Sequence, residues 1–251
     1  MRALTAAVVI FAFCALAATV HVLADEERIT RTVPMQPGGS LRLNNFSGKV
    51  TITGTDRPEV SIDALRHGTA AQLERVKLDI RTEGSSVVVD ADRHDNSWFN
   101  WAGRSNVVDT DLNVKVPRRT NLEIHVFSSP VDVTGVEGTH SVHGFSSPVK
   151  LDGVAGSVRA RTFSGPVEIR ERSWTDDENI DVDTFSGQID LFLPDSARGT
   201  VNFHSFSGRL TSDVPLALNT TSRRTVSAKL GDGGNGELRF KTFSGNVRIG
   251  R

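Results

Sequence analysis

The chain has 251 residues and a formal net charge of −1, and 24% of its residues are charged, as is ordinary for a globular protein. Because positive and negative charges are nearly equal in number, there is no electrostatic reason to expect nucleic acid or an anionic membrane surface as a partner. The single cysteine, Cys14, lies close to the N-terminus. The rest of the chain is therefore predicted to contain no disulfide and no cysteine-based metal site.

Residues 1–24 have the pattern of a secretory signal peptide. Arg2 is followed by an apolar run that starts at Ala3, and small residues precede a cleavage site after Ala24. The alternative is an uncleaved membrane anchor, since the run is nearly long enough to span a bilayer. We expect cleavage near Ala24, no integral membrane span in the mature chain, and a periplasmic, secreted or cell-surface location.

The mature chain, residues 25–251, is predicted to be one all-β domain, because no long low-complexity linker divides it. Its less regular N-terminal part, residues 25–117, is expected to be a β cap on the repeats that follow. Alternating apolar and polar residues predict strands near Ser40–Asn44, Lys49–Thr53, Val60–Leu65, Lys77–Arg81, Val87–Asp92 and Asp109–Val116, with a short helix over Ala70–Val76.

The segment from His94 to Asn106 has an aromatic cluster without strand periodicity. Trp98, Phe99 and Trp101 lie among Asn, Ser, Asp and Gly residues. Exposed aromatic clusters often bind partner proteins, sugars or lipid surfaces, so these three residues are candidate binding residues. The alternative is that this segment folds back over an open end of the repeats.

Residues 118–251 are predicted to form a stack of repeats. The signature is Phe-Ser-(Gly/Ser), and from Phe127 onward successive phenylalanines are 18, 18, 22, 21 and 37 residues apart. The last gap is about two periods, so we expect one degenerate repeat within residues 216–235. The repeated phenylalanines are Phe46, Phe127, Phe145, Phe163, Phe185, Phe206 and Phe243.

Each repeat is predicted to supply two strands. Residues five, three and one before each phenylalanine tend to be apolar or small, as are those four and six after it. Such alternation on both sides of a Ser-Gly corner indicates two half-buried strands. We therefore expect a parallel β-solenoid of about 18 residues per turn, with rungs about 4.8 Å apart and the phenylalanine rings in an internal column. The alternative is a β-sandwich of similar hairpins.

The side chains that could carry chemistry are each explained more simply by structure. The repeated serine recurs at a corner without a base fixed beside it, so it is not expected to be a nucleophile. His125 and His143 share an outward column, but the spacing fixes no third metal ligand. Asp181 and Asp183 are predicted to face Arg159 and Arg161 as ion pairs. We predict no catalytic residue, no metal site and no cofactor.

These features resemble the bacterial "putative adhesin" family of exported β-strand-repeat proteins of unknown function. The resemblance rests on the N-terminal segment, the repeats around Phe127, Phe145 and Phe163, and the runs Asn113–Pro117 and Asn121–Ile124, followed by the glycine-rich turn 231–236. It implies an exported all-β protein and brings no catalytic residues.

The sequence therefore predicts a non-enzymatic structural or interaction module of the bacterial cell envelope or surface. Its expected partners are an envelope or surface protein or a glycan. The alternative is a carbohydrate-active β-helix enzyme, based on Asp181, Asp183 and Asp190, or a glycan-binding protein.

Overall fold

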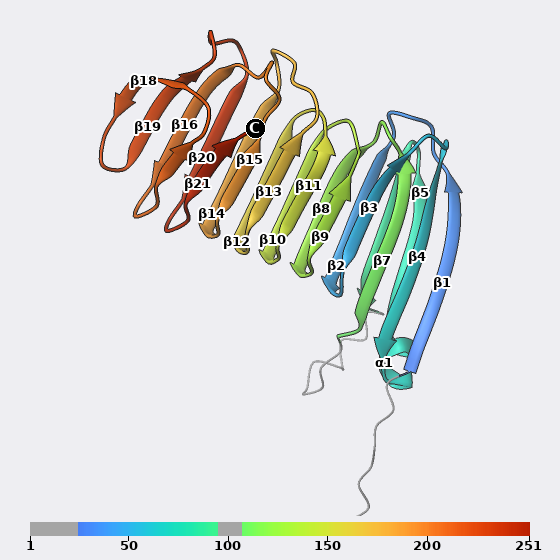
Figure 1. The fold of residues 1–251 in the computed structure, drawn as a ribbon. Coiled ribbons are helices and arrows are strands. Elements are labelled where there is room, and N and C mark those ends of the chain that lie inside the picture. Colours follow the sequence, from blue (N-terminus) through green and yellow to red (C-terminus); the bar gives the residue numbers. More distant parts are fainter. Residues whose placement is uncertain (1–24, 95–106) are drawn as a thin grey trace, which may run out of the picture.

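The computed structural model describes residues 25–94 and 107–251, which are almost entirely β-structure. Figure 1 shows two layers that run the length of the molecule, and within each layer the strands lie side by side across that length. The first sheet has the order β1-β4-β7-β3-β9-β11-β13-β15-β21-β17 and the second β18-β19-β16-β20-β14-β12-β10-β8-β2-β6-β5. In the first sheet the strands are β1 (Asp25–Pro34), β3 (Val50–Thr55), β4 (Glu59–Gly68), β7 (Asp109–Pro117), β9 (Val131–Thr134), β11 (Val149–Val154), β13 (Val167–Glu171), β15 (Ile189–Phe192), β17 (Leu210–Ser212) and β21 (Val247–Gly250). In the second they are β2 (Ser40–Ser47), β5 (Val76–Glu83), β6 (Ser86–His94), β8 (Asn121–Ser128), β10 (His140–Ser146), β12 (Val158–Ser164), β14 (Asn179–Ser186), β16 (Gly199–Ser205), β18 (Leu216–Thr221), β19 (Thr225–Leu230) and β20 (Glu237–Thr242).

From β8 to β15 the chain alternates between the two sheets, and neighbouring strands are parallel. Leu122 pairs with His140, and His140 pairs with Val158, so each offset is 18 residues. The next offset, from Val158 to Ile180, is 22. The longer repeat includes residues 172–178, from which Trp174 enters the core and donates a 3.0 Å hydrogen bond from Nε1 to the carbonyl of Arg198.

The strands predicted before residue 118 are confirmed, as is the helix, which is α1 (Ala70–Arg75). Thr69 caps α1: its side chain accepts a hydrogen bond from the Gln72 amide, and the Gln72 side chain accepts one from the Thr69 amide. One strand was not predicted, β1, which pairs antiparallel with β4 at the edge of the first sheet. Among the described residues, no helix combines the length and apolar character needed to cross a membrane.

The C-terminal strands do not stack in chain order. β20 pairs with β14 on one side and β16 on the other, and β21 similarly lies between β15 and β17 (Figure 1). The prediction of a degenerate repeat within 216–235 is wrong, because that stretch holds the antiparallel strands β18 and β19 at the sheet edge. The physical reason is burial: Leu238 and Phe240 of β20 are fully buried, whereas most of β18 is exposed.

The core lies between the sheets and consists mainly of Val, Ile and Leu side chains. In β12, for example, Val158, Ala160 and Thr162 are buried while Arg159 and Arg161 are exposed, which confirms the predicted alternation. Fully burying one such aliphatic side chain contributes about 1.5–3 kcal/mol. These inward columns therefore supply most of the stabilisation. They also contain four ionisable residues, Arg66, His140, Glu171 and Glu178.

The prediction of an internal phenylalanine column is wrong. The seven repeat phenylalanines are 39–52% exposed and line the outside of the corner that follows the second-sheet strands. The reason is strand parity. The residue just before each phenylalanine points inward, as Thr162, Thr184 and Thr242 do, so the next residue must point outward. The rings do stack, but on the surface of the molecule.

Candidate functional site

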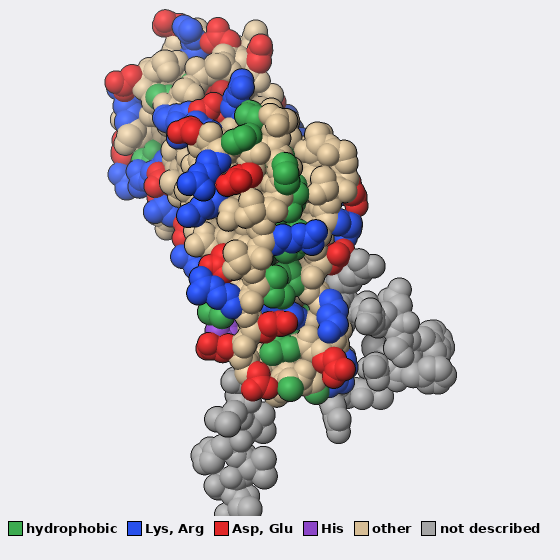
Figure 2. Space-filling model, turned by 90° about the vertical axis from the view of Figure 1, so that its right-hand side faces the viewer, with side chains coloured by type: hydrophobic (Ala, Val, Ile, Leu, Met, Phe, Trp, Pro, Cys, Tyr) green, Lys and Arg blue, Asp and Glu red, His purple; other side chains and the backbone are tan. Residues whose placement is uncertain are grey.

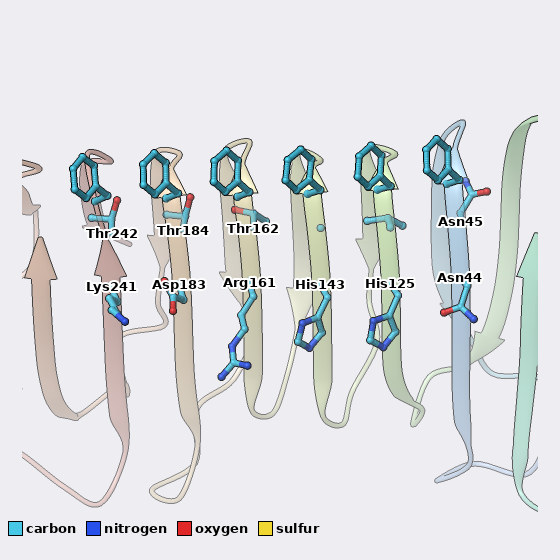
Figure 3. A pocket seen from close by; sticks show the side chains of 18 of the residues that line it. Asn44, Asn45, His125, His143, Arg161, Thr162, Asp183, Thr184, Lys241 and Thr242 are labelled. Carbon is cyan, nitrogen blue, oxygen red and sulfur yellow. The ribbon is translucent and has the colours of Figure 1, made fainter. Parts of the chain in front are cut away.

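The seven exposed phenylalanines form one continuous stack, here called the Phe ladder. Adjacent ring centroids are 4.7–5.0 Å apart and adjacent ring planes differ by 3–8°. The ladder is therefore about 30 Å long, since rung spacing in a β-sheet fixes the repeat. Figure 3 shows the rings in a single row at the ends of their strands. Along the stack, the order is Phe46, Phe127, Phe145, Phe163, Phe185, Phe243 and Phe206.

The ring geometry favours mutual contact. Parallel rings in van der Waals contact lie about 3.5 Å apart measured between their planes, which is less than the observed centroid separation. Neighbouring rings are therefore slipped sideways, which is the offset stacking that aromatic pairs prefer. At one end of the ladder the Arg224 guanidinium lies 4.4 Å from the Phe206 ring centroid, within the range of a cation–π interaction.

Tight corners hold the rings in register. The Gly245 amide donates a 2.7 Å hydrogen bond to Thr242 Oγ1, and the Gly208 amide donates a 2.6 Å bond to Ser205 Oγ. Both hydroxyls come from the inward residue just before a ladder phenylalanine. The repeated Ser-Gly sequence therefore serves the corner: the backbone turns sharply there and leaves the preceding ring on the outside.

A second column of side chains runs beside the ladder on the outer face of the second sheet. It consists of the residue two positions before each phenylalanine and is called the flanking column. His125 and His143 stack in it with ring centroids 5.0 Å apart, and His125 Nε2 lies 3.1 Å from Glu123 Oε1. Burial, and next the neighbouring His125, lower the pKa of His143. The flanking column is Asn44, His125, His143, Arg161, Asp183, Lys241 and His204. All of these except His204 are labelled in Figure 3.

An open trough of about 940 Å³ runs between the ladder and the flanking column. Its lining includes all seven ladder phenylalanines and all seven members of the flanking column. Each ladder phenylalanine is followed in the sequence by a serine, from Ser47 to Ser207, and Ser146 Oγ lies 3.5 Å from Ser164 Oγ. The site is thus an apolar ridge beside a trough of mixed polarity.

The exposed apolar area is large for a protein of this size. Phenylalanine buries about 150–250 Å² when fully enclosed, so seven half-exposed rings present on the order of 600 Å². The largest apolar patch of a typical monomer is about 300–600 Å² and is often functional. Figure 2 shows acidic and basic side chains interspersed over the face that it presents. Apolar contact, rather than net charge, is therefore the main binding chemistry that the surface offers.

The other predicted sites are less prominent. Trp98, Phe99 and Trp101 lie outside the described residues. The His125–His143 pair has no partner set for a metal ion, since no group of three or more suitable ligands occurs in the described part of the chain. Asp181 Oδ2 lies 3.5 Å from Arg159 Nε, which matches the predicted ion pair, and Asp190 accepts hydrogen bonds from Gln188.

Comparison with known proteins confirms the predicted resemblance. A crystal structure described as "a putative cell adhesion protein" from Clostridium sporogenes is 10% identical and gives a TM-score of 0.52, covering 89% of this chain and 99% of that one. "A putative adhesin" from Bacteroides fragilis, also 10% identical, gives a TM-score of 0.35 over 89% and 97% of the two chains. No curated protein matches the chain. The model of the Toastrack DUF4097 family matches residues 121–250, just over half of the sequence, and the chain therefore belongs to this family.

Proposed function

We propose that this protein is an exported, non-enzymatic, adhesin-like module of the bacterial envelope or surface, and that it binds through the Phe ladder. One observation carries the proposal: seven outward positions hold phenylalanine, and the seven rings are kept in register on the outside of the fold. Exposing this much apolar surface opposes solubility, so its repetition along the stack favours a contact function.

In this proposal residues 25–251 form one domain, a β-solenoid that carries the Phe ladder. The signal peptide in residues 1–24 directs its export. The parallel pairings with offsets of 18 residues support the solenoid. A stack of this kind suits adhesion, because consecutive rungs fix one another and the binding strip stays straight without a ligand. One similar solved structure is described as a putative cell adhesion protein, which agrees with this role.

Removing two central rings should weaken binding to isolated bacterial envelope fractions at least tenfold. The variant Phe145→Ser with Phe163→Ser removes two adjacent rings from the middle of the strip and leaves the core untouched, because both rings are almost half exposed. Binding is measured by co-sedimentation of labelled protein with the envelope fraction. The matched control is Lys150→Ser with Glu168→Ser, which changes two outward residues on the first-sheet side of neighbouring rungs.

Equal binding by the ladder variant and the control variant would remove the ladder from the proposal. The same assay tests the aromatic segment, which we propose as a second contact: Trp98→Ala with Trp101→Ala should weaken binding without lowering the free energy of unfolding. Hydrolysis of a glycan by the protein, lost in Asp181→Asn or Asp183→Asn, would favour the enzyme alternative and contradict the non-enzymatic role.

A further inference from the structure

We propose that the Phe ladder pairs with the Phe ladder of a second copy of this chain, in parallel and in register. The inference rests on the proposed function, in that it takes the ladder as the contact surface and names its partner. The starting observation is shape. An apolar ridge and an open trough run side by side along the same seven rungs, so the surface carries both halves of a ridge-in-trough contact.

Symmetry selects the direction of the pairing. A two-fold axis parallel to the ladder, placed between ridge and trough, lays the ridge of each copy in the trough of the other. A two-fold axis that crosses the ladder leaves lateral positions unchanged, so it sets ridge against ridge and trough against trough. Only the parallel arrangement fills both troughs, and a closed isologous contact of this kind ends at two copies.

Two of the three charged members of the flanking column, Arg161 and Lys241, favour the same direction, whereas Asp183 does not. In the parallel arrangement, each flanking column faces the partner's rings, so Arg161 and Lys241 lie against aromatic side chains. Contacts of this type already occur within the chain, where Arg224 covers Phe206 and Arg170 lies 3.8 Å from the Phe192 centroid. An antiparallel arrangement, centred on the middle ring Phe163, would bring Arg161 of one copy against Arg161 of the other.

The repeat distance favours a partner of the same construction. Two ladders with the same 4.7–5.0 Å spacing stay in register over all seven rungs, whereas a polymer with another repeat drifts out of register along the strip. If each copy contributes about 600 Å², the contact buries about 1,200 Å², which is the lower end for specific interfaces. We therefore expect a reversible dimer with a dissociation constant in the micromolar range.

Analytical ultracentrifugation tests the dimer. The protein is expressed with its own N-terminal segment and purified in the form that the cell yields. We expect a monomer–dimer equilibrium that Phe145→Ser with Phe163→Ser weakens at least tenfold, while Lys150→Ser with Glu168→Ser leaves it unchanged. Circular dichroism confirms that each variant is folded. A dimer that the ladder variant leaves intact, or a protein that stays monomeric up to about 200 μM, overturns the proposal.

Cross-linking tests the direction. In a Cys14→Ser background, Ser128→Cys and Ser244→Cys each place one thiol beside the second ring from one end of the ladder. With a bismaleimide long enough to span the two paired ladders, parallel pairing cross-links each variant to itself. Cross-linking only in a mixture of the two variants would show antiparallel pairing and overturn the parallel one. A monomer whose envelope binding still depends on the ladder would reject self-pairing and leave the proposed function standing.

Discussion

Replacing Glu171 with glutamine should raise the free energy of unfolding by about 3 kcal/mol at pH 7. Glu171 ends β13 and points into the core; it is 7% exposed, and neither carboxylate oxygen has a hydrogen-bond partner among the described residues. Burial, and next the charge of Glu178, raise the pKa of Glu171 from 4.5 to about 9. The folded protein therefore holds this carboxyl in its neutral form at pH 7, while the unfolded chain ionises it.

The sign of the pH dependence follows from this difference. Because the pKa of Glu171 is higher in the folded state, the free energy of unfolding is highest with respect to this group below about pH 4.5 and falls as the pH rises toward 9. Urea unfolding between pH 7 and pH 8.5 should show the parent losing about 1.4 kcal/mol per pH unit and Glu171→Gln losing much less. Below pH 7 the buried His140, whose pKa is lowered from 6.5 to about 4, contributes a slope of the opposite sign. The control Glu168→Gln, which changes an outward residue of the same strand, should keep the slope of the parent. Identical slopes for the parent and Glu171→Gln would contradict the assignment.

Adding a single methyl group at Gly245 should destabilise the fold by about 4 kcal/mol. A Cβ at this position would lie 2.0 Å from the carbonyl oxygen of Gly187 on the neighbouring rung. The same closeness recurs along the corner, where a Cβ at Gly187 would lie 2.2 Å from the Gly165 oxygen and one at Gly208 would lie 1.9 Å from the Gly245 oxygen. These neighbours are backbone atoms, so they cannot move aside unless the rungs separate.

Urea unfolding followed by tryptophan fluorescence measures this effect, since Trp174 is buried in the core. Gly234→Ala is the matched control: its Cβ would meet nothing closer than the flexible side chain of Arg198, at 3.4 Å, and it should change the free energy of unfolding by less than about 1 kcal/mol. A loss below 1 kcal/mol in Gly245→Ala would mean that the rungs tolerate a wider corner than the structure shows.

Much of the fold follows from local pattern. The inward positions of Leu122, Ile124 and Val126 were predictable because apolar residues alternate with polar ones. The same parity also places Phe127 outside, and the prediction of an internal column is wrong because the hydrophobicity of phenylalanine was given more weight than its position in the strand. The exposed ladder could therefore have been found by counting one residue beyond Val126. Glu171 could have been found similarly, because it continues the inward positions of Val167 and Ile169.

The order of the last strands could not be predicted in this way. The pattern of β20, with Leu238 and Phe240 inward, fits any interior position of the second sheet equally well. Its place between β14 and β16 depends on the long antiparallel excursion through β18 and β19, which are paired with each other and with β16. The place of β20 depends on which of several strands pairs most favourably with the edge of the sheet. The pattern of a single strand does not indicate which one that is.

This strand order makes β16 and β17 depend on strands that come later in the chain. Residues 237–250 supply β20 and β21, which lie near one end of the two sheets, each between two other strands; β16 and β17 pair in parallel only with these two strands. Because a chain is synthesised from its N-terminus, β16 and β17 cannot pair with β20 and β21 until residues 237–250 have been made. Loss of the last fifteen residues would therefore split the binding strip near its end and detach Phe206 from the rest, instead of merely shortening the row by one ring.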